Sequence, residues 1–475
     1  MENNYDVIIV GAGPAGIFAA YELSIIAPKK SVLLLDKGKP IDKRRCPMLE
    51  KKLSKCPETA DGEFGCLPSC GITNGFGGAG AYSDGKFNVT SAFGGWMTSY
   101  MDEDSVEALI EYVDKINLKH GASTAITNPE TDEVKAIEKR GLAVGLKLLK
   151  AKVRHLGTEE NLEILKRIYA YLKDKVTICF DSPIKDIVVK DRVIEGIVLA
   201  NDEVIKAEHV ALMPGRDGAA WLETLCQKHN LSQSVNHVDI GVRVETSNEI
   251  MEEINKHLYE GKFVYHASVG TMVRTFCSNP SGHVVIENHG GTMLANGHAY
   301  RDENLGSANT NFALLVSHAF ETPFKRPNNF AKGIANLANM LSNGSVIVQK
   351  YGDFKKGRRT TEKRLQEGFV RPTLKEAFPG DLGLVLPYNT LVSIIEMIEA
   401  LDKVTPGIAS AHTLFYGVEA KFYSARPKIN TQFESEINNL YFGGDGAGIT
   451  RGLAQASASG VHIARSMMKK EANHG

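Results

Sequence analysis

The chain has 475 residues, and its 55 basic side chains nearly balance its 56 acidic ones, for a net charge of −1. Such a balance gives no overall field favouring nucleic acid or an anionic membrane. With 43% hydrophobic and 23% charged residues it has the composition of an ordinary soluble protein, too long for a single core, so two domains are expected. Without a basic start typical of a secretory signal, the seven cysteines predict a cytoplasmic protein with free thiols or metal ligands rather than disulfides.

The first 36 residues carry the strongest pattern. An apolar strand is predicted over residues 5–10, followed by a Gly-x-Gly-x-x-Gly turn and a helix of small residues, and a second apolar strand ends on an acid. In such a unit the first glycine allows the tight turn, the second admits a pyrophosphate, and the third lets the helix pack on the strand. The free N–H groups of the helix attract the diphosphate, and the acid can hydrogen-bond a ribose 2′-hydroxyl. The predicted dinucleotide-binding residues are Gly11, Gly13, Pro14, Ala15, Gly16, Asp36 and Lys37. The alternative is a tight turn of glycines without a ligand. Residues 7–27 are apolar enough to suggest a membrane span, but the glycine turn and Glu22 argue against one.

The middle of the chain changes from helical to strand periodicity. Residues 105–173 predict helices, with breaks near Asn128 and Gly157. Short strands are expected over 176–180, 184–189, 193–199 and 204–207, followed by an apolar strand that begins at 209 and ends at Gly215. A meander of this kind, followed by a strand that ends on a glycine, is typical of an FAD-binding βαβ fold, and it makes Gly215 a candidate cofactor contact.

A second glycine motif follows the predicted strand 439–445 and opens a helix over 446–468. This arrangement resembles the C-terminal motif of FAD enzymes of the glutathione-reductase superfamily. The resemblance implies that Asp445 hydrogen-bonds the ribityl chain or the pyrophosphate. It also implies that the turn from Gly446 through Arg451 to Gly452 lies under the pyrimidine ring of the flavin. The alternative is an ordinary helix N-terminus that Asp445 caps.

A third glycine-rich segment covers residues 74–86. Glycines this dense let a backbone lie against a flat ligand, and backbone N–H groups there can stabilise negative charge on a reduced flavin. The candidate contacts are Gly77, Gly78, Ala79, Gly80 and Ser83. Lys86 is a candidate for flavin charge or for substrate, with a solvated loop lysine as the alternative.

These motifs together resemble the FAD-dependent dehydrogenases of bacteria and archaea. The segments that carry the resemblance are residues 77–86, 154–157, 239–245, 274–280, 295–298, 309–312, 379–382 and 444–448. It implies an α/β fold: an FAD-binding Rossmann-like βαβ domain of the glutathione-reductase type, with an inserted α+β substrate or cap domain. The expected division is 1–235 with 405–475 for FAD and 236–404 for the cap. Asp36 stands where many members have Glu.

Four cysteines precede the glycine-rich loop: Cys46, Cys56, Cys66 and Cys70. Four thiolates can hold zinc or an iron–sulfur cluster, which would relay electrons from a ferredoxin-like carrier to the flavin. Redox-active thiols and inert thiols are the alternatives. Cys179 and Cys226 fall in apolar patterns and are expected in the core.

Candidate substrate residues are arginines for carboxylate recognition and histidines or tyrosines for proton delivery. These are Arg154, Arg274, Arg426, His155, His283, His298, Tyr416 and Tyr423, and Cys277, Asn279, Asn296, Asn309 and Asn311 are further polar candidates from the same segments. Each is also readily explained as a structural residue, and the sequence singles out no catalytic acid.

The resulting expectation is an FAD-dependent oxidoreductase that moves a hydride between flavin N5 and a small organic substrate, with NAD(P)H or a ferredoxin-like protein as possible electron donor. The alternatives are a flavin enzyme without net redox turnover, such as a hydratase or isomerase, a flavin electron-transfer protein, and an NAD-only dehydrogenase, which the Asp445 motif disfavours. Neither nucleic acid nor membrane is an expected partner.

Overall fold

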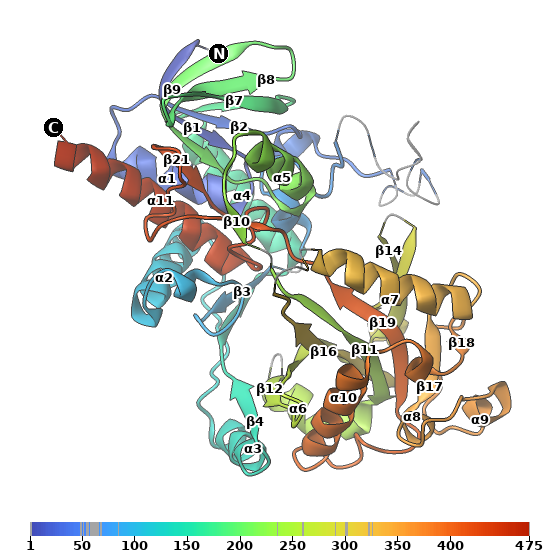
Figure 1. The fold of residues 1–475 in the computed structure, drawn as a ribbon. Coiled ribbons are helices and arrows are strands. Elements are labelled where there is room, and N and C mark those ends of the chain that lie inside the picture. The colour runs from blue at the N-terminus through green and yellow to red at the C-terminus, as the bar shows by residue number, and fades with distance from the viewer. Residues whose placement is uncertain are drawn as a thin grey trace. The chain divides into compact units, whose positions relative to one another are not determined.

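The computed structural model of the chain describes residues 2–47, 50, 52–53, 57, 66, 69–83, 85–234, 236–258, 261–289, 291–299, 303–321, 324 and 326–474. The chain divides into two compact units (Figure 1). Unit 1 comprises residues 1–127, 151–234 and 424–475, and unit 2 comprises residues 128–150 and 235–423.

Unit 1 is built on a parallel sheet whose strands come from both ends of the chain. Its strands are β1 (Asn4–Val10), β2 (Val32–Leu35), β6 (Thr177–Cys179), β9 (Val204–Leu212) and β21 (Leu440–Phe442). They run in the order β6-β2-β1-β9-β21, and every neighbouring pair is parallel. The antiparallel strands β7 (Ile184–Lys190) and β8 (Val193–Leu199) extend the sheet along the first half of β9. The central strands are nearly continuous apolar runs, as expected of a sheet that is covered on both faces.

Helices and short strands complete unit 1. They are α1 (Pro14–Ile26), β3 (Lys86–Val89), α2 (Glu103–Lys119), β5 (Lys152–His155), α4 (Gly157–Leu172), α5 (Ala219–Lys228), β10 (Gln233–Ser234), β20 (Arg426–Pro427) and α11 (Leu453–His474). Helices α1 and α11 lie side by side (Figure 1). Their contact is so close that a Cβ atom at Gly460 would lie 1.9 Å from the carbonyl oxygen of Ala15.

Unit 2 contains an eight-stranded sheet in the order β18-β17-β19-β11-β16-β13-β12-β4, antiparallel except for the β17–β18 pair. Its strands are β4 (Leu146–Leu149), β11 (Val238–Ser247), β12 (Lys262–His266), β13 (Met272–Asn279), β16 (Asn309–His318), β17 (Ile347–Lys350), β18 (Phe378–Pro379) and β19 (Leu414–Lys421), beside the hairpin β14 (His283–His289) and β15 (Thr292–His298). Its helices are α3 (Asp132–Leu142), α6 (Asn248–His257), α7 (Pro327–Leu341), α8 (Tyr351–Phe354), α9 (Glu362–Gln366) and α10 (Tyr388–Leu401).

The central strand β11 has two different faces. Ile240, Val242 and Val244 alternate into the hydrophobic core of unit 2. Because successive side chains of a strand point to opposite faces, Asp239 and Arg243 lie on the other face. This second face is polar although its members are buried.

Several elements match those predicted from the sequence, and others differ because strands that are distant in the chain pair with each other. The β1–α1–β2 unit and the meander are present, but the expected strands at 204–207 and 209–215 form one strand, β9, which ends at Leu212. The expected helical stretch 105–173 was wrong over residues 146–155, where β4 pairs with β12 and β5 pairs with β3.

The two units also differ from the expected division of the chain. Residues 128–150 and 405–423, which the sequence placed in the first domain, belong to unit 2, because β4 pairs with β12 and β19 pairs with β11. Cys226 is buried, as expected, and Cys179 is partly buried. Within the described ranges, no helix has both the length and the apolar character needed to cross a bilayer.

Candidate functional site

The first and last motifs of the chain meet at the carboxyl ends of the parallel strands in unit 1. The Gly11 N–H donates to Leu35 O at 2.7 Å, and a Cβ atom at Gly11, whose φ is +103°, would lie 2.4 Å from Met213 O. The Gly446 N–H donates to Pro214 O at 2.9 Å. The loop after β9 therefore lies between the first glycine turn and the Asp445 turn, although Asp445 stands 434 residues after Gly11.

The start of α1 fits a phosphate group. A Cβ atom at Gly16 would lie 1.8 Å from Gly11 O, so this position requires a glycine for helix–strand packing. A Cβ atom at Gly13 would have no atom within 4 Å, so the turn opens on free space there. No side chain caps α1, and its first turn carries no acid. An anion in the space at Gly13 would complete the helix N-terminus, which begins with Pro14 and Ala15.

Asp36 follows β2, as the sequence indicates, and its carboxylate is engaged by backbone groups. Oδ2 accepts a hydrogen bond from Ala12 N at 2.8 Å, and Oδ1 accepts from Gly38 N at 2.7 Å and Gly75 N at 2.8 Å. These donors belong to three separate turns. The ribose contact that the sequence predicts for Asp36 stays a prediction.

A short turn after β9, residues 216–218, faces both motifs. Arg216 Nε lies 4.0 Å from Asp445 Oδ2, and Asp217 Oδ2 accepts from Lys37 Nζ at 2.5 Å and from Asn74 Nδ2 at 3.0 Å. Desolvation raises the pKa of Asp217, but the hydrogen bond and charge of Lys37 outweigh it and hold the pKa below its ordinary value. Arg216 and Asp217 were not predicted as site residues, because the spacing of the glycines around them matches no fingerprint.

The glycine-rich loop lies against the first turn. Gly77 N donates to Ala12 O at 2.8 Å, and a Cβ atom at Gly78 would lie 3.1 Å from Gly13 Cα. Gly80 O accepts hydrogen bonds from Asn161 Nδ2 and Ser83 Oγ, both at 2.8 Å. Ala79 is exposed in the same 3₁₀ turn. The loop therefore lies against the first glycine turn, and the flavin contact that the sequence predicts for it stays a prediction.

Arg44, another residue that the sequence analysis missed, holds this loop from inside. It is 1% exposed, and its guanidinium donates to the carbonyl oxygens of Gly71, Ile72, Phe76 and Gly78 at 2.6–3.0 Å. Desolvation lowers its pKa. No sequence pattern distinguishes Arg44 from its neighbour Arg45.

The second motif is covered by a segment outside the sequence-based site. Asp445 Oδ1 accepts from Thr450 Oγ1 at 2.7 Å, and desolvation raises the Asp445 pKa against the lowering effect of this hydrogen bond and of two arginines. Arg451 N donates to Gly94 O at 2.8 Å, and a Cβ atom at Gly452 would lie 3.5 Å from Gly94 Cα. Gly94 (φ +97°) thus adds a glycine backbone to this turn.

Several substrate candidates gather on the polar face of the unit 2 sheet. Asp239, which is fully buried, accepts from Arg274 Nη2 at 2.8 Å and also from Ser317 and the Tyr423 hydroxyl. Farther along β11, Arg243 donates to Asn311 Oδ1 at 2.9 Å.

The second group on this face is also buried and polar. Asn279 Nδ2 shares the Asn311 oxygen at 3.1 Å, Arg243 Nη1 lies 3.5 Å from Glu419, and Tyr416 donates to Glu245. The face thus offers arginines and hydroxyls, and two of its buried donor atoms, Arg274 Nε and Asn311 Nδ2, have no hydrogen-bond partner among the described residues.

Other candidates lie elsewhere. Arg154 in unit 1 is 4% exposed and makes a paired contact with Asp114 at 2.7–2.8 Å, which accounts for it as a structural residue. Arg426 lies over the Trp96 ring at 4.4 Å, and Cys277 is exposed. The remaining candidates occupy strand or turn positions: Lys86 and His155 face each other across β3 and β5, His283 contacts Leu305 O, Asn296 donates to Glu287, Asn309 donates to Arg371 O, and His298 ends β15.

The cysteine loop gives the metal-site alternative no support. Cys46, Cys66 and Cys70 are free thiols, and Cys56 lies outside the described residues. Within the part of the chain that the structure describes, no three His, Cys, Asp or Glu side chains come together as a metal site.

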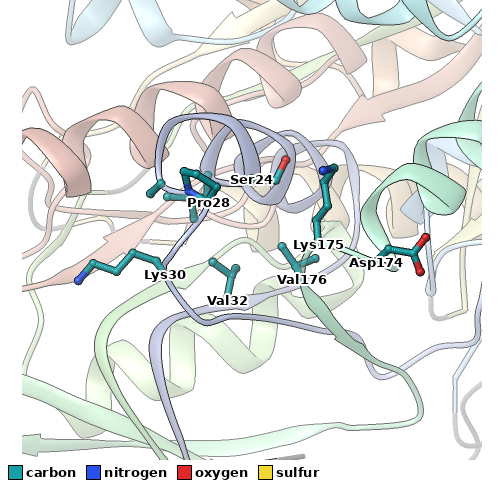
Figure 2. A pocket seen from close by; sticks show the side chains of 9 residues that line it. Ser24, Pro28, Lys30, Val32, Asp174, Lys175 and Val176 are labelled. Carbon is teal, nitrogen blue, oxygen red and sulfur yellow. The ribbon is translucent and has the colours of Figure 1, made fainter.

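A small cavity of about 190 Å³ lies at the other end of the sheet (Figure 2). Part of it is lined by Ser24 in the last turns of α1, Pro28 in the loop after α1, Val32 at the start of β2 and Lys175 before β6. Ligands of open parallel sheets bind at the carboxyl ends of the strands, so this cavity is separate from the candidate cofactor site.

Residues 237–422 match the family described as "FAD-dependent protein, C-terminal domain-like". No curated protein matches the chain at a significant level. The chain is similar to L-proline dehydrogenase from P. horikoshii (11% identity, 99% of this chain and 95% of that chain, TM-score 0.38) and to the E. coli quinol fumarate reductase FrdA (13%, 99% and 71%, 0.39). It is also similar to pyridoxine 4-oxidase from Mesorbium loti (11%, 98% and 99%, 0.44). Likenesses this weak carry no argument about function, whereas the family match falls within unit 2 and supports an FAD-dependent protein.

Proposed function

We propose that the chain is an FAD-dependent oxidoreductase that exchanges a hydride between its flavin and a small organic substrate. The observation that carries this proposal is the convergence of the Gly11–Gly16 turn and the Asp445 turn on one loop at the carboxyl edge of a parallel sheet. A nucleotide site needs only the first turn, whereas a second turn beside it suits the longer FAD molecule. The family match of residues 237–422 supports the same cofactor.

The chain's own residues have distinct parts in this proposal. FAD, when bound, supplies hydride transfer at N5. The uncapped N-terminus of α1 binds the pyrophosphate at Gly13, and Asp445 and the Gly446–Gly452 turn hold the ribityl chain and the ring end. The backbone of the Gly77–Gly80 loop, which Arg44 fixes, lies along the cofactor. We assign this proposed arrangement to the glutathione-reductase type.

The polar face of unit 2 suits the substrate. Its buried donors, Arg274 Nε and Asn311 Nδ2, require acceptor atoms that the described residues do not provide. The orientation of the Asn311 side-chain amide follows from its contact with Arg243. An arginine can only donate, so the atom that accepts from it must be the amide oxygen, and Nδ2 is the atom without a partner. A small carboxylic acid supplies such acceptors, and NAD(P)H or a ferredoxin-like protein is the proposed electron donor.

The test is the visible spectrum of the purified full chain, before and after anaerobic dithionite, with FAD added to any colourless protein. Absorption peaks at about 375 and 450 nm that bleach on reduction are expected. A protein that stays colourless with added FAD overturns the proposal. Iron and zinc are measured on the same sample, and stoichiometric metal would revive the cysteine-loop alternative.

A matched pair of variants locates the site. Gly13→Val fills the space at the start of α1, so bound FAD per chain should fall at least tenfold. Gly333→Ala, in α7 of unit 2, adds a methyl where no atom lies within 4 Å and should retain wild-type FAD. Reoxidation of the reduced protein by a panel of small unsaturated and keto acids then separates an oxidoreductase from a flavin enzyme without net redox turnover.

A further inference from the structure

The segment that runs from the end of β17 to β18 in unit 2 is strongly basic. Residues 350–376 carry nine basic and four acidic side chains, whereas the whole chain has a net charge of −1. The segment contains α8 and α9, and α9 lies at the periphery of unit 2 (Figure 1). The expectation of no nucleic-acid partner rests on the charge of the whole chain, and that average hides a local excess of positive charge.

Few of these cations are neutralised by an acid. Asp353 contacts Arg358 Nε at 2.6 Å and Arg364 Nε at 3.6 Å, and Glu399 of α10 pairs with Lys355. Five other basic side chains are exposed and make no ion pair with an acid among the described residues: Lys356, Arg359, Lys363, Arg371 and Lys375. The exposed acids of the same segment likewise pair with none of them: Glu362, Glu367 and Glu376. The segment therefore presents unbalanced cations to solvent.

Hydrogen bonds orient two of these cations without cancelling their charge. Arg359 Nη2 donates to Pro379 O at 3.4 Å, and Arg371 Nη1 donates to Gln366 O at 2.5 Å. A carbonyl oxygen is a neutral acceptor, and each contact uses one N–H group of a guanidinium that has about five. Both arginines are thus held in place and keep donors for an anion.

An exposed aromatic ring belongs to the same surface. Phe369 is 84% exposed, and its ring stacks on that of His412 with 4.0 Å between the centroids and 21° between the planes. Phe369 N donates to His412 Nδ1 at 3.4 Å, which fixes the pair. Burial and the nearby charge of Lys350 lower the pKa of His412, so its ring is neutral at pH 7 and can accept this bond. The stack presents one flat ring face to solvent, close to Lys350 and to Arg371.

We propose that this basic surface, residues 350–376 with His412, binds single-stranded nucleic acid. A nucleobase continues the Phe369–His412 stack, and the unbalanced cations bind backbone phosphates. An acidic protein would use the cations without requiring a flat exposed ring, whereas single-stranded nucleic acid uses both, so the ring favours nucleic acid. The surface lies wholly in unit 2, and the proposal is independent of bound FAD.

The test is fluorescence anisotropy of a fluorescein-labelled single-stranded oligothymidylate of about 12 nucleotides, titrated with the full-length protein. The titration is repeated between about 50 and 200 mM salt. The wild type should bind at micromolar concentration at the lower salt. If about three to five phosphates are contacted, the logarithm of the binding constant should fall against the logarithm of the salt concentration with a slope of about −2 to −3.5.

Two variants separate stacking from charge. Phe369→Ala should weaken binding by about fivefold or more and leave the salt slope unchanged, because it removes only the stacking ring. Lys363→Gln should weaken binding and make the slope shallower by about 0.7, because one phosphate contact is lost. The matched controls are Tyr388→Ala, which removes another exposed ring of unit 2, and Lys190→Gln, which removes an exposed lysine of unit 1. Neither control should change the affinity or the slope.

Three results would overturn the proposal. One is no binding of the oligonucleotide at about 50 mM salt. Another is a Phe369→Ala variant that binds like the wild type. The third is inorganic polyphosphate that competes as strongly as unlabelled oligothymidylate at equal phosphate concentration, because charge alone, which an acidic protein also offers, would then account for the binding. None of these results bears on the FAD proposal, which the visible spectrum tests separately.

Discussion

The contact between α1 and α11 predicts that Gly460 tolerates no side chain. In Gly460→Ala the new Cβ atom would lie 1.9 Å from Ala15 O and 2.9 Å from Ala19 N. Both obstacles are backbone atoms of α1, so no side-chain rotation relieves them. The helices must separate by more than 1 Å, a movement that would also disturb the start of α1 at the glycine turn.

The expected loss follows from two opposing terms. Overpacking a core costs about 1–3 kcal/mol, and a backbone obstacle places this site at the upper end of that range. Alanine in a helix interior gains about 1 kcal/mol over glycine. The net destabilisation is therefore about 2 kcal/mol, which corresponds to a thermal midpoint lower by roughly 4–8 °C.

Tryptophan fluorescence in a thermal or urea scan measures this effect, since both tryptophans of the chain, Trp96 and Trp221, lie in unit 1 with Gly460. The control is Gly333→Ala, the same exchange inside α7 of unit 2, where no atom lies within 4 Å. It should leave the fluorescence midpoint unchanged. A Gly460→Ala midpoint equal to or above that of the wild type would refute the close packing of α1 on α11.

Two further predictions concern charged groups. Arg154→Met should destabilise unit 1 by about 3–5 kcal/mol in urea denaturation, because it leaves Asp114 buried without its cation. The control is Arg192→Met at an exposed position, which should cost under about 0.5 kcal/mol. Equal losses of stability in the two variants would contradict a buried Arg154–Asp114 pair. The hydrogen bond from His289 holds the pKa of Glu287 at about 2, below its ordinary value of 4.5. A carboxyl whose pKa is lowered by folding adds stability above its unfolded-state pKa and loses it as the pH falls through the folded value. The urea midpoint of unit 2, followed by circular dichroism, should therefore fall less steeply between about pH 4.5 and 2 in Glu287→Gln than in the wild type, and parallel curves would count against this pairing.

Local sequence was sufficient to predict the β1–α1–β2 unit, the meander and the glycine turns. The need for glycine at position 16 follows from neighbours within a few residues, whereas the backbone that crowds Gly11 belongs to Met213 and Pro214. No strand was predicted at β11, although Asp239 and Arg243 share one face at a spacing that any strand imposes.

Tertiary structure decided which of these residues come together and which of their hydrogen-bonding atoms the protein already occupies. The pairing of β4 with β12 placed residues 128–150 in unit 2, and it overrode the helical pattern over Leu146–Leu149 only, since α3 is a helix as predicted. Asp36 is the acidic residue of a nucleotide-binding pattern, but only the fold shows that its carboxylate accepts hydrogen bonds from Gly38 and Gly75. Only the fold shows, too, that Asp217 follows β9, on the other side of β1 from β2, and that Asn74 and Lys37 contact just one of its two carboxylate oxygens. Sequence patterns encode spacing along the chain, whereas hydrogen-bond occupancy and burial depend on contacts between segments hundreds of residues apart.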